Sequence, residues 1–124
     1  MLLKSWNKYL DKYLPEQKDI YFTEEYCGLY EDGIKQTEAF VYTEGDSVFL
    51  MPYLKSRIGD TGYYDFETPY GYGGPISNSG NQEFLSTSLN RCLIDLKNEN
   101  IIAGFVRLHP VLNNSKLMNN KYLV

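Results

Sequence analysis

The sequence is poor in the residues that build metal sites and disulfide frameworks. Its 124 residues include two cysteines, Cys27 and Cys92, and one histidine, His109. A structural zinc site takes four cysteine or histidine ligands, so this chain has too few. Both cysteines fall in expected helices, where we predict them to be small buried hydrophobic residues rather than a disulfide pair. The sequence therefore predicts no metal site.

Long apolar runs and basic runs are also missing. No stretch approaches the roughly 20 apolar residues that cross a bilayer. The first residues lack the apolar core and cleavage site of a signal peptide. The net charge is -4 and the pI about 4.9, and no cluster of lysine and arginine is present to follow a phosphate backbone. These absences predict a cytoplasmic protein with no membrane span and no direct binding to nucleic acid.

The composition is otherwise that of a single globular domain, with one excess. Hydrophobic residues make up 43% of the chain and charged residues 23%, which is ordinary for a domain of this length. Twelve tyrosines stand beside a single tryptophan. Because tyrosine has a flat apolar body and one polar tip, the excess suits either a wide polar cleft or a thin core with half-wet walls. Composition leaves both interpretations open.

Three segments have the apolar period of a helix. The first is expected to be capped by Ser5 and ended by Pro15, and the second to begin after Thr23 as its N-cap. The third follows Ser79 and Gln82, which fit a capping box. Apolar stripes at helical spacing mark the buried faces of the first and third helices. They consist of Trp6, Tyr9, Leu10, Tyr13 and Leu14 in the first, and Leu85, Leu89, Cys92, Leu93 and Leu96 in the third.

Four further segments read as strands. Residues 37–43 and 47–54 predict a hairpin that turns at residues 44–46. The second of these strands begins with an unbroken apolar run, so we expect it to be buried on both faces. Pro52 indicates a bulge or a sheet edge within it. Residues 65–68 and 101–108 complete the set, and the alternation of strands and helices predicts an α/β fold.

The most distinctive stretch is rich in glycine and tyrosine. It reads Thr68-Pro69-Tyr70-Gly71-Tyr72-Gly73-Gly74-Pro75. Gly73 and Gly74 let the backbone approach a ligand closely, the flanking prolines restrict it, and Tyr70 and Tyr72 offer ring faces and hydroxyls. It is interpreted either as a ligand-lining loop or as a rigid bend between a strand and a helix. It matches neither a P-loop nor a dinucleotide fingerprint.

A second candidate lies at the end of the last strand. Arg107 and His109 share a strand face with the apolar residues before them, and ligands gather beyond the carboxyl ends of strands in open α/β sheets. Arg107 could bind a carboxylate or phosphate, or form a structural ion pair with Asp65 or Glu67. His109 fits a hydrogen-bonded strand end better than a general base. No residue is predicted to be catalytic, since nothing marks a nucleophile.

Four stretches in this order resemble the first half of the Fem-like branch of the GNAT acyltransferase superfamily. They are Asp19-Ile20-Tyr21-Phe22-Thr23-Glu24-Glu25-Tyr26, Leu50-Met51-Pro52-Tyr53-Leu54, Pro69-Tyr70-Gly71-Tyr72-Gly73-Gly74-Pro75 and Phe105-Val106-Arg107-Leu108-His109-Pro110-Val111-Leu112. The resemblance covers nearly the whole chain. It implies a GNAT-like mixed, mostly antiparallel sheet flanked by about three helices, in a single domain over residues 1–124 that is truncated near residues 113–124.

That family transfers aminoacyl or acyl groups to an amine, in the building of peptidoglycan cross-bridges or in capsule and exopolysaccharide synthesis. The resemblance implies that the Tyr/Gly segment and the Arg107 strand end face the cleft for a small-molecule or glycan-precursor acceptor. It also implies that an aminoacyl-tRNA or acyl-CoA donor binds elsewhere, with no cofactor in this chain. The chain alone is then expected to turn over no substrate.

Two alternatives belong to other functional classes. The first is a non-catalytic interaction or dimerisation module with a GNAT-like fold, because an exposed sheet edge pairs readily and would allow a homodimer. The second is a small acetyltransferase that uses acetyl-CoA. The absence of an Arg/Gln-x-x-Gly-x-Gly/Ala loop before a helix disfavours this second alternative.

Overall fold

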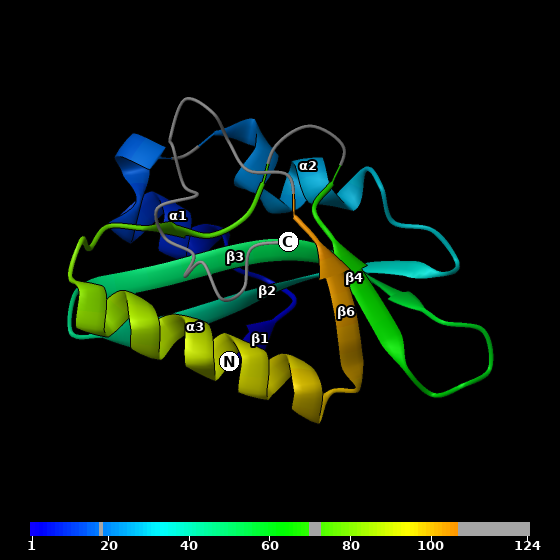
Figure 1. Cartoon of the computed structure of the whole chain (residues 1–124). Coiled ribbons are helices and arrows are strands. Elements are labelled where there is room, and N and C mark those ends of the chain that lie inside the picture. Colours follow the sequence, from blue (N-terminus) through cyan, green and yellow to red (C-terminus); the bar gives the residue numbers. More distant parts are fainter. Residues whose placement is uncertain (18, 70–72, 107–124) are drawn as a thin grey trace.

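The described residues, 1–17, 19–69 and 73–106 of the computed structural model, form an α/β fold with a mixed sheet (Figure 1). In chain order the elements are β1 (Leu2–Leu3), α1 (Asn7–Tyr13), the 3-10 turns η1 (Pro15–Gln17) and η2 (Ile20–Phe22), α2 (Glu24–Gly28), β2 (Lys35–Glu44), β3 (Ser47–Arg57), β4 (Tyr64–Glu67), β5 (Ile76–Ser77), α3 (Gln82–Asn98) and β6 (Ile101–Phe105). The strand order is β1-β2-β3-β4-β6, and β5 also pairs with β3. The pairing of β4 with β6 is parallel and the others are antiparallel.

The β2–β3 hairpin is the longest pairing of the sheet and confirms the predicted hairpin. Its register closes at Glu44 opposite Ser47, and Gly45 has the positive φ of 58° that a two-residue hairpin turn requires. Both strands run further than the spacing predicts, to Lys35 and Arg57. The apolar run of β3 is buried on both faces as predicted. Alternate residues enter different cores, because side chains of a strand point to opposite sides.

Pro52 lies between the part of β3 that pairs with β4 and the part that pairs with β5. β4 pairs with β3 as far as Leu54, and β5 begins opposite Leu50. Three residues of β3 lie between these two partners, whereas the eight residues 68–75 join β4 to β5. Gly73 of the joining chain also forms a β-bridge. Pro52 pairs in regular register with Ala39 of β2, so the bulge or sheet edge predicted at Pro52 does not occur on that side.

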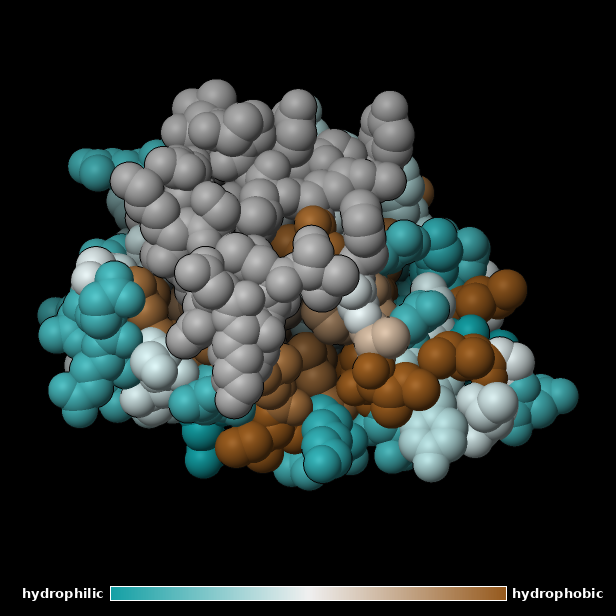
Figure 2. Space-filling view, in the orientation of Figure 1, coloured by the Kyte–Doolittle hydropathy of each residue, from teal (hydrophilic) through white to brown (hydrophobic). Residues whose placement is uncertain are grey.

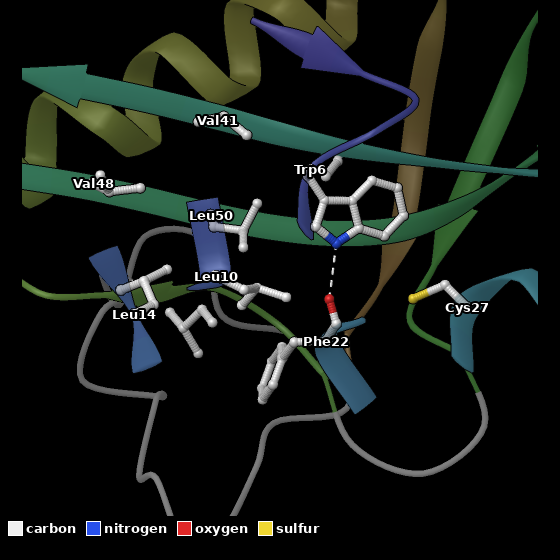
Figure 3. Packing of buried hydrophobic residues seen from close by; sticks show 10 residues of the cluster. Trp6, Leu10, Leu14, Phe22, Cys27, Val41, Val48 and Leu50 are labelled. Carbon is white, nitrogen blue, oxygen red and sulfur yellow. Dashed lines mark hydrogen bonds between the residues drawn. The ribbon is translucent and has the colours of Figure 1, made fainter. Parts of the chain in front are cut away.

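One core lies between the sheet and the layer formed by α1, η2 and α2 (Figure 3). Its central side chain is Trp6, which is fully buried and donates a hydrogen bond from Nε1 to the carbonyl oxygen of Phe22 at 2.8 Å. Leu10 and Leu14 lie beside it, and Tyr9 and Tyr13 pack at the rim. The predicted stripe of the first helix is thus confirmed, with the tyrosines as its half-buried members.

The second core lies under α3, on the opposite face of the sheet. Its members are Phe40, Phe49, Met51, Tyr53, Phe84, Leu85, Leu89, Cys92, Leu96 and Ile101. Leu93, which the spacing placed on the buried face of α3, is instead 41% exposed. It lies one position beyond Cys92, and a stripe through Leu85, Leu89 and Leu96 leaves it at the solvent boundary.

The cap of α1 differs from the one predicted. Ser5 does not cap the helix. Instead the Glu24 carboxylate, at the start of α2, accepts hydrogen bonds from the backbone N–H groups of Trp6 at 3.0 Å and Asn7 at 2.7 Å. Asn7 returns the interaction, because its Oδ1 accepts from the Glu24 N–H at 2.9 Å. A carboxylate is well suited to this position, since unpaired N–H groups give a helix N-terminus positive character. The cap of α2 itself is Thr23, as predicted.

The cap of α3 is also shifted from its predicted place. Asn81 is the N-cap, and its Oδ1 accepts from the Phe84 N–H at 3.0 Å. Ser79 instead accepts a hydrogen bond from the Asn81 N–H at 3.2 Å. The capping box predicted from Ser79 and Gln82 was therefore two residues early. Asparagine caps helices as well as serine does, and the approach of the chain from β5 decides between them.

Candidate functional site

The predicted substrate-binding residues lie only partly within the described chain. Gly73 and Gly74 are described. The other four lie outside the described residues, so their predicted roles stay predictions. They are Tyr70, Tyr72, Arg107 and His109. Glu67, the alternative ion-pair partner considered for Arg107, pairs with Lys35 at 2.8 Å.

Glycine is required at positions 73 and 74, the two described glycines of residues 68–75, for two different structural reasons. A Cβ atom on Gly73 would lie 2.7 Å from Cγ2 and 2.8 Å from Cβ of Thr68, which is closer than packed carbons come. Gly74 has a φ of 89°, a conformation that side-chain-bearing residues rarely adopt. Pro69 and Pro75 are buried. The two described ends of the segment are thus held rigidly against the sheet, and residues 68–75 join β4 to β5 rather than a strand to a helix.

A buried polar cluster lies on the α3 face of the sheet. The Lys55 ammonium is 3.0 Å from Oε1 of Glu38, and the two side chains are only 15% and 10% exposed. The Tyr53 hydroxyl donates to Oε2 of the same carboxylate at 2.9 Å. Burial, and then the adjacent Glu38 charge, raises the pKa of Tyr53 far above its ordinary value. Tyr53 is therefore a hydrogen-bond donor and not a base.

An open cleft of about 350 Å³ adjoins this cluster. It is lined by Gly33, Ile34, Gln36, Lys55, Arg57 and Tyr64. The polar members come from three neighbouring strands, because Gln36 of β2 lies opposite Lys55, and Tyr64 of β4 lies opposite Arg57. Directly opposed residues of antiparallel strands are about 5 Å apart, so these side chains meet on one face. The cleft is cationic in its lining, and its volume is within the range of small-ligand sites.

Sequence reasoning did not single out the cleft, although part of its signal was present. Tyr53, Lys55 and Arg57 alternate along one strand, so their spacing predicts a common face. The contributions of Gln36 and Tyr64 depend on which strands become neighbours. Residue spacing within one segment does not contain that information.

The cysteines do not contribute to either site. Cys27 and Cys92 are free and buried, in the cores on opposite faces of the sheet. Burial raises the pKa of each thiol to about 12, so both stay protonated and poorly nucleophilic at neutral pH. This confirms their prediction as buried hydrophobic residues. Within the described chain, no three potential metal ligands gather, and none of the described helices has the length and apolar character to cross a bilayer.

No family model, curated protein or solved structure matches this chain.

Proposed function

We propose that this chain is the acceptor-binding portion of an aminoacyl or acyl transferase of cell-wall or surface-polysaccharide synthesis, in which the acyl group passes to an amine. The observation that carries the proposal is the close packing of the described ends of residues 68–75, where Gly73 lies against Thr68 and both Pro69 and Pro75 are buried. This segment is one of the four stretches whose sequence resembles the Fem-like acyltransferases. The GNAT-like arrangement of the mixed sheet is part of the same proposal.

A closely packed segment beside a buried strand suits a ligand-binding wall. The close contact of Gly73 with Thr68 and the left-handed Gly74 support a preformed wall. A preformed wall lowers the ordering cost of binding. Such transferases mainly align an amine with an activated carbonyl, so rigid positioning is the contribution that this half supplies.

Arg107 is the proposed charged contact to the acceptor, through a sugar phosphate or a peptide carboxylate. The donor, an aminoacyl-tRNA or acyl-CoA, would bind outside this chain. Isothermal titration with a nucleotide-linked sugar peptide is expected to give saturable binding. Arg107→Ala is expected to weaken it about tenfold or more, because a hydrogen bond to a charged group contributes about 1.5–3 kcal/mol.

Arg91→Ala is the matched control for that titration. Arg91 is an exposed arginine of α3, and its removal lowers the positive charge equally. The affinity of the Arg91→Ala variant for the sugar peptide is expected to equal that of the unaltered chain. Equal weakening by both substitutions would show a general charge effect, and unchanged affinity of Arg107→Ala would remove that residue from the site.

The second candidate function is an interaction or dimerisation module, which the β6 edge favours. β6 ends the described strand order, and apolar side chains are exposed over α3 and β6 (Figure 2). They include Leu93, Ile94 and Ile102, the last 61% exposed. Exposed apolar edges pair readily with other chains.

This candidate is tested by light scattering over a range of concentrations. A module of this kind is expected to dimerise, and Ile102→Lys is expected to return it to a monomer, because a lysine on an edge strand opposes strand pairing. Ile20→Lys is the control, since Ile20 is equally exposed, at 62%, and lies in η2. A monomer at every concentration would contradict the module.

A further inference from the structure

Arg57 is a cation on the α3 face of the sheet with no carboxylate among the described residues within ion-pairing distance. It lies at the end of β3, two residues beyond Lys55, and is exposed to the cleft that it lines. An acidic residue directly opposite an arginine on the neighbouring strand would stabilise its charge. Here the cross-strand neighbour is Tyr64, whose side chain has no carboxylate.

The carboxylates of neighbouring residues interact with groups other than Arg57. Asp65 and Glu67 alternate with Tyr64 along β4. Glu67 forms an ion pair with Lys35, and the negative charge of Asp65 also interacts electrostatically with Lys35. Asp32 accepts hydrogen bonds from the backbone N–H groups of Ile34 and Lys35 at 2.7 and 2.8 Å. Its carboxylate therefore holds the turn that forms the Gly33–Ile34 wall of the cleft. None of these groups forms an ion pair with Arg57.

Glu38 has a different effect, because it fixes the second cation of the cleft. Its two oxygens hold Lys55 and Tyr53, and the Lys55 ammonium also lies 4.8 Å from the ring centroid of Tyr64. A long lysine side chain is usually free to move, and fixing it on binding costs conformational entropy. In this cluster that ordering has already taken place in the folded chain.

We propose that this cleft binds the oxyanion of a small molecule, with Arg57 as its main ligand and Gln36 and Lys55 at its sides. A guanidinium presents a planar pair of N–H donors that matches a carboxylate or a phosphate. The Gln36 amide adds neutral donors. None of the described residues of the 68–75 segment lines the cleft, and the argument for the cleft uses no residue of the proposed transferase site.

The test is a nuclear magnetic resonance titration of the whole chain, with sodium phosphate in one series and sodium succinate in another. Sodium chloride keeps the ionic strength constant, because exposed charges respond to salt. Saturable shifts are expected at the backbone amides of Ile34, Lys55 and Arg57. Arg57→Gln is expected to weaken the binding about tenfold or more, and Arg91→Gln to leave it unchanged.

Saturation by either anion supports the site, and the anion that binds more tightly identifies whether a carboxylate or a phosphate is preferred. Arg57→Gln is expected to fold normally because the side chain is exposed, and its amide spectrum reports this directly. The proposal is overturned by shifts that never saturate, by shifts distributed equally over all lysines and arginines, or by an unchanged affinity of folded Arg57→Gln.

Discussion

Replacing Trp6 with alanine is expected to lower the free energy of unfolding by about 3–5 kcal/mol, the usual cost of removing a large buried aromatic side chain. Trp6 is fully buried, contacts the core of α1, and donates to the Phe22 carbonyl. The total free energy of unfolding of a small domain is only about 5–15 kcal/mol, so this substitution would remove much of the stability of the fold. Urea unfolding followed by circular dichroism measures it, since tryptophan fluorescence disappears with the only tryptophan.

Two controls separate the volume of Trp6 from its hydrogen bond. Trp6→Phe keeps most of the apolar contact and removes the Nε1 donor, so it is expected to cost less than Trp6→Ala. Tyr9→Ala shortens a half-buried member of the same stripe, and its smaller loss of buried area predicts a smaller effect. If Trp6→Ala were no more destabilising than Tyr9→Ala, the side chain would not be the centre of this core.

Replacing Glu38 with alanine is expected to destabilise the fold by about 3 kcal/mol. The substitution leaves the Lys55 ammonium and the Tyr53 hydroxyl without their shared acceptor. Removing one partner of a buried ion pair costs about 3–5 kcal/mol. We expect the low end of this range because the side chains of Lys55 and Glu38 are still 15% and 10% exposed to solvent. Chemical denaturation monitored by tyrosine absorbance and by circular dichroism measures the loss.

The double substitution Glu38→Leu with Lys55→Met tests the cause. Apolar residues of similar volume remove both charges together, and such replacements of ion pairs are often close to neutral. The double variant is therefore expected to be more stable than Glu38→Ala. Glu38→Leu alone and Lys55→Met alone are the matched single changes that complete the cycle. Losses that simply add would contradict coupling between the two charges, because residues in contact are expected to show an interaction energy.

The pattern of residues within a single segment predicted helices and strands well where it contained one strong periodic signal. The stripe through Trp6, Leu10 and Leu14 predicted the buried face of α1, and alternation around Gly45 predicted the hairpin. The cap of α1 could not be predicted in this way. Its acceptor, Glu24, lies 17 residues from the Asn7 N–H that it binds, so a rule that reads neighbouring residues pointed to Ser5.

The candidate site shows the same division. The sequence by itself determined the features that depend on residue type and spacing: a strand buried on both faces, two glycines and a proline where the backbone must bend or pack closely, and a tyrosine, a lysine and an arginine on one face of β3. Only the tertiary structure decided that β4 and β5 both pair with β3, and that Gln36, Lys55, Arg57 and Tyr64 line one cleft. The physical reason is that side-chain period sets the face of a strand, whereas long-range pairing sets its neighbours and register.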